Sequence, residues 1–358
     1  MGRRNKGPTR HKKKSGGRPP PTSRGKAAAI EAKRRERDER LDRDRARLLA
    51  KYEGVEPDGI VICQYGTHAE TALTDGTVRL CMLTPKVHKV FGICVGDRVW
   101  TERGATDEER IIVARQPRRT FVRRRRGEED RTGHVIAANV DRMAITVALR
   151  QPPLRTGAID RYLVLASILE LEPLIVLAKI DLAPEDDPGW EVLEPYRALG
   201  VPILATSAES GKGLDELLEA LRGGVTVFAG HSGVGKSSIC LALGIHDAPE
   251  AGDMSTAHGR VRGRHTTSIA KLLELPGGGG WVVDTPGVRA IGLVDLRRED
   301  ARVHFPELHE IAEECVYVDC LHVGEEGCAV PEAVEEGRLP AARHEGYLRL
   351  MESLEEGH

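Results

Sequence analysis

Aromatic side chains and long apolar runs are both scarce in this sequence of 358 residues. Phe, Trp and Tyr together make up 4% of the chain, which argues against a large surface for stacking nucleic-acid bases. No stretch is apolar over the roughly 18 or more residues that a membrane span requires. The positive N-terminus lacks the apolar run of a secretory signal, and the acidic residues between 31 and 44 are unlike a mitochondrial transit peptide. We therefore predict a cytoplasmic protein with no membrane segment.

Cysteine is too sparse and too uneven for a disulfide framework. The chain has seven cysteines, an odd number, and three of them lie close together near the C-terminus. Such a cluster is typical of a metal site in a reducing compartment. The other four are expected to be core residues because each lies in an apolar run: Cys63, Cys81, Cys94 and Cys240.

Charge is small in total but unevenly distributed. The net charge is −2, yet residues 1–50 hold 18 Lys and Arg against six Asp and Glu, a net charge of +12. Residues 1–26 lack apolar periodicity and are predicted to be disordered in isolation, whereas Ala27–Tyr52 has the interleaved charges of a solvated helix. We predict that residues 1–56 form a basic arm. In one interpretation it binds RNA phosphates, and in the other it only keeps the protein soluble.

Residues 57–115 have the pattern of a small β-barrel. Four short β-rich runs are separated by turns that contain Gly, Asp or Pro: Gly59–Tyr65, Thr77–Leu83, Asp97–Glu102 and Glu109–Ala114. Short strands at this spacing predict a barrel of the oligonucleotide-binding (OB) type, although other small barrels fit the same count.

A basic linker is predicted to follow the barrel at residues 116–133. It contains Arg118, Arg119 and the run Arg123–Arg126. Two interpretations fit such a charge run equally: a solvated loop, or a contact to RNA phosphates.

Residues 134–303 change to alternating strands and helices. Apolar runs at Val135–Leu149 and Pro173–Ile180 are suited to buried strands, and the helix-like segment Ile159–Leu171 lies between them. This alternation predicts an α/β fold with a parallel sheet covered by helices on both faces. Residues 304–358 hold the cysteine cluster and a charged helical tail, and we predict that they form a separate C-terminal domain.

A phosphate-binding loop follows the apolar strand Val225–Ala229. The loop fits G-x-x-x-x-G-K-[ST] and precedes a helix-like run, which is the context that the motif needs. Its glycines let backbone N–H groups turn toward phosphate oxygens. Lys236 would neutralise the β- and γ-phosphates, and the Ser237 hydroxyl would bind Mg²⁺. The predicted phosphate-binding residues are Gly230, His231, Ser232, Gly233, Val234, Gly235, Lys236, Ser237 and Ser238.

Two later segments complete the predicted Mg²⁺ and γ-phosphate site. In Asp284-Thr285-Pro286-Gly287 the carboxylate ends an apolar strand and would hold the water shell of Mg²⁺, while the Gly287 N–H would contact the γ-phosphate. The segment Gly263-Arg264-His265-Thr266-Thr267 lies in a Gly- and Arg-rich stretch, which is typical of a loop ordered by Mg²⁺ and γ-phosphate. Either Thr266 or Thr267 would reach the metal, and the sequence does not distinguish them.

Guanine recognition is predicted from two motifs that precede the phosphate loop. GTPases hold guanine with an Asn-Lys-x-Asp motif, whose carboxylate accepts hydrogen bonds from N1–H and the N2 amino group, and with a Ser-Ala motif after the next strand. Here Ala178-Lys179-Ile180-Asp181 and Thr206-Ser207-Ala208 follow apolar strands at suitable spacing. Ordinary GTPases have both motifs after the phosphate loop, so this order predicts a circular permutation of the same site. The predicted base-binding residues are Lys179, Asp181, Ser207 and Ala208.

Ala178 stands where the guanine motif has asparagine. Loss of one hydrogen bond of this kind weakens binding by about 0.5–1.5 kcal/mol. Asp181 keeps the charge-assisted selection against adenine. We therefore predict a guanine preference at reduced affinity, with a P-loop ATPase as the alternative.

The C-terminal cysteines have the spacing of a zinc site. Cys315-x4-Cys320-x-His322-x5-Cys328 places three thiols and one imidazole within 14 residues. Three thiolates and one histidine make a closed tetrahedral Zn²⁺ site, which is structural rather than catalytic. The spacing predicts one zinc ion per chain, and buried free cysteines are the alternative.

Together these motifs resemble the ribosome small subunit-dependent GTPase family. The resemblance spans roughly residues 57–335 and rests on the motif order, the Gly263–Thr267 segment, Asp284–Gly287 before an apolar residue, and the Cys/His spacing. It implies a circularly permuted GTPase domain between an OB barrel and a C-terminal zinc domain. It also implies binding to the small ribosomal subunit and its rRNA during late maturation, with GTP hydrolysis accelerated by the subunit. The basic arm at residues 1–50 lies outside the shared region, and Ala178 departs from the family's asparagine. We expect a monomer.

The residue that orients the attacking water is not the usual one. Many GTPases use a Gln directly after the Asp-x-x-Gly segment, but this chain has Val288, which cannot hydrogen-bond. His265 is the candidate, because it resembles the family's switch-loop histidine; a structural histidine is the alternative. The predicted catalytic residues are His265, Lys236, Thr266 and Thr267. A factor that binds nucleotide without hydrolysing it is the rival to this enzyme.

Overall fold

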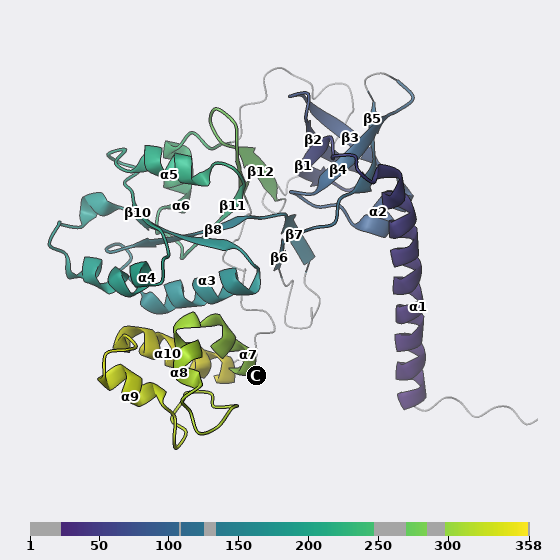
Figure 1. The fold of residues 1–358 in the computed structure, drawn as a ribbon. Coiled ribbons are helices and arrows are strands. Elements are labelled where there is room, and N and C mark those ends of the chain that lie inside the picture. The colour runs from purple at the N-terminus through teal and green to yellow at the C-terminus, as the bar shows by residue number, and fades with distance from the viewer. Residues whose placement is uncertain (1–22, 107–108, 125–133, 247–269, 285–297, 357–358) are drawn as a thin grey trace, which may run out of the picture. The chain divides into compact units, whose positions relative to one another are not determined.

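The computed structural model describes residues 23–106, 109–124, 134–246, 270–284 and 298–356 (Figure 1). The chain forms two units, Met1–Glu53 and Gly54–His358. In the first unit, helix α1 (Ser23–Leu49) leads into the short 3₁₀ helix η1 (Ala50–Tyr52). Charged residues dominate α1, and Arg45 pairs with Asp42 one turn earlier at 2.8 Å. This helix therefore has the solvated, charge-interleaved character that the sequence predicts for it.

Five strands of the second unit close into a barrel. They are β1 (Gly59–Tyr65), β2 (His68–Leu73), β3 (Val78–Leu83), β4 (Arg98–Arg103) and β5 (Arg110–Arg115). Neighbouring strands run in the order β1-β2-β3-β5-β4, and β4 pairs again with β1. Only the β3–β5 pair is parallel among these strands. This closed five-stranded barrel confirms the predicted OB-type architecture.

The sequence does not predict two elements of the barrel, β2 and helix α2 (Pro85–Phe91). The buried positions of β2 alternate, but they hold Ala69, Thr71 and Leu73, so small and polar residues weaken the apolar signal of a strand. The start of α2 is set locally, because the Thr84 hydroxyl accepts a hydrogen bond from Val87 N at 3.2 Å.

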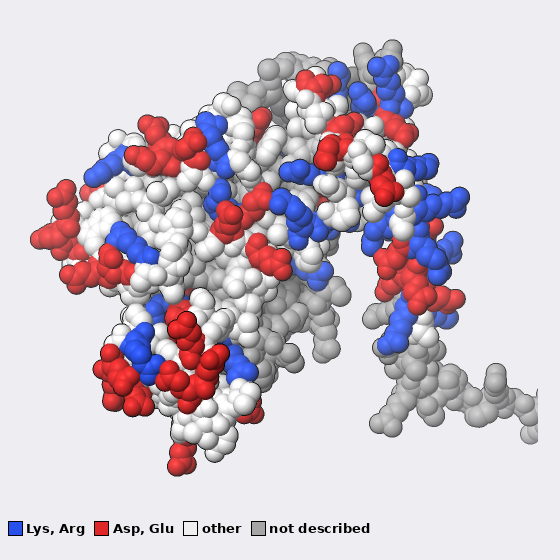
Figure 2. Space-filling view, in the orientation of Figure 1, with Lys and Arg blue, Asp and Glu red and all other residues white. Residues whose placement is uncertain are grey.

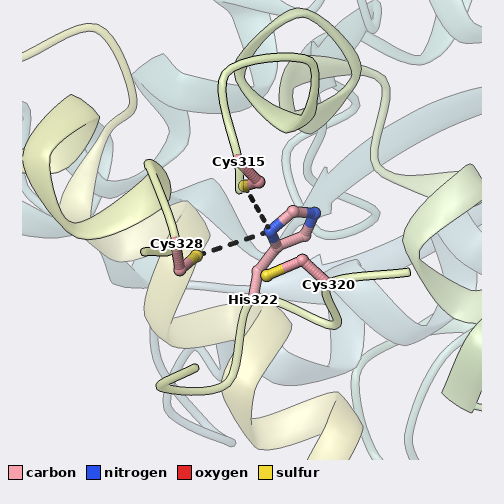
Figure 3. Close-up of side chains that lie close together, drawn as sticks. All are labelled: Cys315, Cys320, His322 and Cys328. Carbon is pink, nitrogen blue, oxygen red and sulfur yellow. Dashed lines mark hydrogen bonds between the residues drawn. The ribbon is translucent and has the colours of Figure 1, made fainter. Parts of the chain in front are cut away.

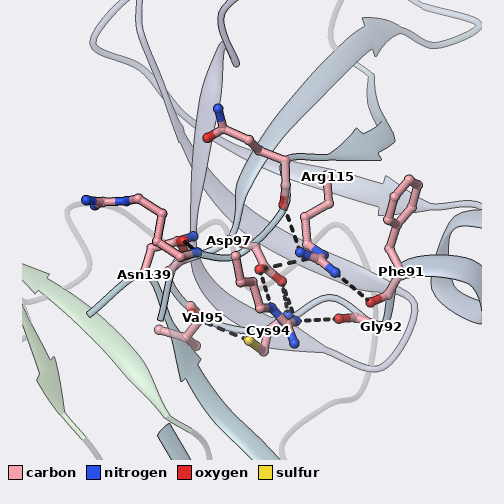
Figure 4. A network of polar contacts seen from close by, with 11 residues as sticks. Phe91, Gly92, Cys94, Val95, Asp97, Arg115 and Asn139 are labelled. Atoms are coloured by element: carbon pink, nitrogen blue, oxygen red, sulfur yellow. Dashed lines mark hydrogen bonds and ion pairs between the residues drawn. The ribbon is translucent and has the colours of Figure 1, made fainter. Parts of the chain in front are cut away.

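A buried ion pair fixes the segment after the barrel (Figure 4). Asp97 is fully buried and accepts hydrogen bonds from Arg118 Nε and Nη2 at 2.7 and 2.8 Å. Arg118 also donates to the Gly92 carbonyl, and its side chain is only 14% exposed. The sequence leaves Arg118 as either a solvated residue or a phosphate contact; the structure instead makes it the counter-ion of a buried carboxylate.

Part of the predicted linker at residues 116–133 is instead a strand. β6 (Phe121–Arg124) pairs antiparallel with β7 (His134–Ala138). The apolar run predicted at Val135–Leu149 is therefore two strands, divided at Asn139, which adopts a positive φ of 52°. Its side chain donates to the Gly96 carbonyl and accepts from Arg119 N, so this break is braced on the barrel.

Loss of the Arg118 ion pair is expected to destabilise the fold. Arg118→Ala leaves the Asp97 carboxylate buried beside Arg115 Nε, which lies 3.7 Å away, and breaking a buried pair costs roughly 3–5 kcal/mol. Arg119→Ala is the matched control, because Arg119 is 65% exposed in its pair with Asp141 and such pairs contribute about 1 kcal/mol or less. Urea unfolding followed by tryptophan fluorescence measures both. Equal unfolding midpoints for the two variants would contradict the structural role of Arg118.

The α/β domain contains six strands of a sheet that continues into the barrel. Its strands are β8 (Arg142–Ala148), β9 (Glu172–Ala178), β10 (Ile203–Ala205), β11 (Val225–Ala229), β12 (Lys271–Glu274) and β13 (Trp281–Asp284). The order is β10-β9-β8-β11-β13-β12, with five parallel strands and β12 antiparallel at the end. β12 also pairs with β1 of the barrel through Cys63 and Lys271.

Helices cover both faces of this sheet, as predicted (Figure 1). The covering helices are α3 (Thr156–Ile168), α4 (Glu194–Ala198), α5 (Leu214–Leu221) and α6 (Lys236–Ala242), with 3₁₀ turns η2 (Ile180–Leu182) and η3 (Pro188–Leu193). Alternate residues of β8 enter opposite cores. Met143 and Ile145 pack with α3 and α4, whereas Ala144 packs with α5 and α6. Apolar residues on both strand faces explain why β8 and β9 are continuous apolar runs.

The C-terminal domain is helical and packs on α3. It contains α7 (Arg298–Ala301), η5 (Arg302–His304), η6 (Pro306–Leu308), α8 (His309–Ala312), α9 (Val330–Glu335) and α10 (Ala341–Glu356). Val164 of α3 joins the core of this domain beside Phe305 and Tyr347. Asp160 of α3 pairs with Arg343 of α10, and burial raises the pKa of Asp160 to about 6 although Arg343 opposes this shift. Within the described ranges, no helix has the length and apolar character to cross a membrane.

Candidate functional site

The phosphate loop lies between buried strand β11 and helix α6. Gly230 has a φ of +140°, and a Cβ there would lie 2.3 Å from the Thr146 carbonyl oxygen, so only glycine fits. Gly235, with a φ of +107°, directly precedes α6. Lys236 Nζ lies over the loop and donates to the carbonyls of Gly230 and His231 at 2.7 and 2.8 Å. The Lys236 ammonium group is therefore held against the backbone of the phosphate loop.

The predicted base motifs meet at the ends of β9 and β10. The chain turns sharply at Lys179, whose φ is +58°, and places Asp181 in η2. The Ser207 hydroxyl donates to Asp181 Oδ1 at 2.5 Å and accepts a hydrogen bond from Ser210 N at 3.1 Å. Ser207 thus fixes the orientation of the carboxylate.

Lys179 joins the base motif to the phosphate loop. Its Nζ donates to the Gly233 and Gln151 carbonyls, both at 2.6 Å. A cavity of about 350 Å³ is lined both by residues of the base-binding motifs and by residues of the phosphate loop. Its lining residues are Ala178, Lys179, Asp181, Leu182, Ala208, Glu209, Gly235, Ser238 and Ile239. Motifs in permuted order meet because β9 and β11 both pair in parallel with β8 and end at the same sheet edge.

Ala178 forms an apolar part of this cavity. Its side chain is buried, and its Cβ lies 3.6 Å from the position that a Cβ on Gly235 would occupy. The methyl group of Ala178 cannot hydrogen-bond to a base or to the phosphate loop. The polar link between this motif and the phosphate loop therefore comes from Lys179, which donates to the Gly233 carbonyl.

Asp284 is brought to the same edge from the other side of β11. It is the last residue of β13, which pairs in parallel with β11 at Val227 and Val283. Burial raises the pKa of the Cys240 thiol on α6 to about 11, and the negative charge of Asp284 contributes to this shift. Asp284 ends the strand beside β11, which leads into the phosphate loop.

Several predicted site residues lie outside the described residues. They are Gly287 of the second phosphate motif, and His265, Thr266 and Thr267 of the predicted switch loop. Their roles stay predictions.

A second cavity, of about 260 Å³, is lined by other residues of the phosphate loop. His231 and Ser232 of the loop line it together with Arg155 and Tyr162. Burial raises the pKa of the Tyr162 hydroxyl, and the nearby Gly230 backbone opposes this shift. No sequence motif marks Arg155 or Tyr162, because they precede the loop by some 70 residues and only the fold brings them near it.

The C-terminal Cys/His cluster has the geometry of a tetrahedral metal site (Figure 3). The ligand atoms of Cys315, Cys320, His322 and Cys328 all lie within 4.8 Å of one another. His322 Nδ1 lies 3.6 Å from Cys315 Sγ and 3.5 Å from Cys328 Sγ. Tetrahedral Zn²⁺ with its usual Zn–S and Zn–N bond lengths requires about 3.5 Å between these atoms. The donor set and spacing therefore fit Zn²⁺.

Without a metal, the buried thiols of this cluster hold their protons and the imidazole is neutral. Burial, together with the neighbouring Cys328 and Cys315 thiols, raises the pKa of the Cys320 thiol to about 12. Burial also lowers the pKa of His322, which keeps the imidazole neutral. A cation that bound here would release thiol protons and meet an imidazole already in its ligating form.

The combined architecture defines a class of protein. An OB barrel precedes a P-loop domain whose base motifs come before the phosphate loop, and a Cys/His cluster with helices follows. These features define a circularly permuted P-loop GTPase.

Comparison with known proteins identifies the family. Residues 115–294 match the sequence model of the RsgA GTPase family. The crystal structure of YjeQ from Thermotoga maritima matches with a TM-score of 0.68 and 33% identity, covering 84% of this chain and 98% of that one. YloQ, described as a circularly permuted GTPase, matches with a TM-score of 0.65 and 26% identity, covering 85% of this chain and 96% of that one. The chain belongs to the RsgA GTPase family, and it hydrolyses GTP.

Proposed function

We propose that this GTPase acts in late maturation of the small ribosomal subunit in the cytoplasm. It binds the subunit and its rRNA as a monomer, and the subunit accelerates hydrolysis. Membership of the RsgA family supports this role. The net charge of +12 in residues 1–50 supports binding to a polyanion such as rRNA.

The observation that carries the nucleotide assignment is the shared cavity of Asp181 and Gly235. In our proposal, the Asp181 carboxylate accepts hydrogen bonds from guanine N1–H and the N2 amino group. Ser207 holds that carboxylate in position, and the Ala208 N–H faces guanine O6. Adenine carries an amino group and a bare N1 at this edge, so it lacks the donors that Asp181 requires.

The phosphate loop holds the triphosphate in the same proposal. Backbone N–H groups of residues 230–238 donate to phosphate oxygens, and Lys236 turns from its carbonyl partners toward the β- and γ-phosphates. Ser237, Asp284 and either Thr266 or Thr267 hold Mg²⁺ or its water shell. Bound Mg²⁺ would neutralise charge that develops on the transferred phosphoryl group. The Gly287 N–H contacts the γ-phosphate.

The Cys/His cluster is proposed to hold one structural Zn²⁺. All four donors come from the protein, so no position is open to substrate. Cys315, Cys320 and Cys328 bind as thiolates, and His322 binds through Nδ1, the ring nitrogen that lies near the thiols.

His265 is proposed to orient the attacking water, because Val288 cannot. His265→Ala is expected to lower turnover on the small subunit by about 10²–10⁴-fold, the usual contribution of a positioned acid or base, with little change in GTP affinity. Single-turnover kinetics and a titration with a fluorescent GTP analogue measure the two effects separately. Unchanged turnover would remove His265 from the mechanism.

Dependence on the small subunit is tested by turnover with three preparations. We expect phosphate release to be slow for the protein alone, unchanged with purified large subunits, and at least about ten-fold faster with purified small subunits, because subunit contacts complete the site. Lys236→Ala serves as the background control, since it lacks the ammonium that neutralises the phosphates. Equal rates in all three preparations would reject a role for the small subunit.

A further inference from the structure

The loop that carries two of the proposed zinc ligands exposes apolar side chains. Val316, Tyr317 and Val318 lie between Cys315 and Cys320 and are 70%, 55% and 95% exposed. Consecutive large apolar residues with this exposure are uncommon on a protein surface unless they bind a partner. We call residues 316–318 the zinc-loop tip.

The backbone of the zinc-loop tip is held in place. Arg302 Nη1 donates to the Val318 and Cys320 carbonyls at 3.0 and 3.1 Å, and Val316 N donates to the Gly327 carbonyl at 3.0 Å. The Cys315 and Cys320 thiols anchor both ends in the Cys/His cluster. A loop that is already fixed loses little conformational entropy on binding, so its apolar side chains are suited to docking.

A cavity adjoins the tip and can receive an apolar side chain. It measures about 510 Å³. Val303, Leu308, Ala312 and Val318 form its apolar part, and Arg302, His309, Glu313 and the proposed zinc ligands Cys315 and His322 form the rest. Val303 is itself 57% exposed at this surface. The tip and the cavity together offer both a projecting and a recessed apolar surface.

The charge around this surface selects the kind of partner. Residues 298–358 contain 16 Asp and Glu against five Lys and Arg, a net charge of −11. Three of these cations pair with carboxylates: Arg338 with Glu314 and Glu336, Arg343 with Asp160 and Glu307, and Arg349 with Glu345. Arg302 donates to the Val318 and Cys320 carbonyls. Figure 2 shows acidic side chains gathered over this domain. Such a surface repels RNA phosphates and attracts a basic chain.

We propose that the zinc-loop tip and its cavity dock a basic protein segment of the small ribosomal subunit that presents an apolar side chain, and not rRNA. The assignment of the segment to the small subunit rests on the proposed function. Charge brings the basic segment to the acidic domain, and burial of Val318 and Tyr317 then holds it.

The test uses the full chain with the photoreactive residue p-benzoylphenylalanine at position 318, irradiated with intact small subunits and, separately, with their RNA-free protein mixture. We expect a covalent adduct in both samples that survives ribonuclease and contains a basic ribosomal protein by mass spectrometry. An adduct sensitive to ribonuclease, or no adduct in either sample, would overturn the docking proposal. If only the RNA-free proteins react because the chain does not sediment with intact subunits, docking to a basic protein stands and the proposed function fails.

The affinity of the chain for small subunits provides a second test of docking at the zinc-loop tip. Val318→Asp is expected to weaken co-sedimentation with small subunits by at least about ten-fold, because a charge replaces an exposed methyl-bearing side chain that becomes buried in the complex. Val192→Asp is the matched control, since Val192 is also an exposed valine but lies in η3 of the α/β domain. Equal weakening by both variants, or by neither, would contradict docking at the tip, while sedimentation of the wild-type chain tests subunit binding itself.

Discussion

Asp181→Asn is expected to abolish the guanine preference and to create a preference for xanthine nucleotides. The carboxylate accepts two hydrogen bonds from guanine in our account, and hydrogen bonds to charged groups contribute about 1.5–3 kcal/mol each. An asparagine amide faces the guanine N2 amino group with a donor, so GTP affinity should fall by at least about 100-fold, which corresponds to about 2.7 kcal/mol. Xanthine has a carbonyl at that position and accepts from the amide. Competition titrations with GTP, XTP and ATP measure the change.

The matched control is Asp186→Asn, which removes an exposed carboxylate from the loop that follows η2. Asp186 is not among the residues that line the cavity of Asp181 and Gly235, so its loss should leave GTP affinity unchanged. If Asp181→Asn binds GTP as tightly as the wild type, or gains no affinity for XTP, the base lies elsewhere.

Cys320→Ser is expected to release zinc and to unfold the C-terminal domain. Structural zinc contributes roughly 10–16 kcal/mol to the folding of small zinc peptides, and four ligands share that contribution. Cys320 is buried, and the zinc loop hydrogen-bonds to Arg302 of the domain, so loss of the ion should loosen this part of the structure first. Metal analysis should fall from one zinc per chain to less than about 0.1, and amide hydrogen exchange should rise across residues 304–356.

Cys240→Ser is the control for loss of a thiol that lies outside the cluster, and it should keep one zinc per chain.

Acidification should mimic the loss of a ligand, because the raised pKa of Cys320 means that zinc binds by displacing its proton. Zinc affinity is therefore fully present only at higher pH and falls as pH falls. Purified wild-type protein that contains no zinc, with a folded C-terminal domain, would contradict the metal assignment.

Sequence patterns predict the architecture well where a local motif is compatible with only one structure or ligand. The Lys236 loop needs glycines at fixed positions, and a Cys/His cluster has few uses besides metal binding. The five-stranded barrel, the parallel sheet and the cluster are accordingly as predicted. Cys63, Cys81 and Cys94 are buried, as their apolar context predicts, and Cys240 is half-buried.

Patterns fail where the decisive partner is distant in sequence. Nothing local distinguishes Arg118, which pairs with buried Asp97, from Arg119, which is largely exposed. β2 is recognised only from its pairing with β1 and β3, since its own residues are weak strand formers. The link from Lys179 to the Gly233 carbonyl spans 54 residues, so no motif announces it.

The central claim is that Asp181 and the phosphate loop grip one guanine nucleotide despite their permuted order. A crystal structure of the full chain grown with GDP and Mg²⁺ tests it most directly. We predict that guanine N1 and N2 lie about 3 Å from the Asp181 carboxylate oxygens while the β-phosphate contacts backbone N–H groups between Gly233 and Ser237. A nucleotide whose base lies away from Asp181, with its phosphates still in the loop, would contradict the account.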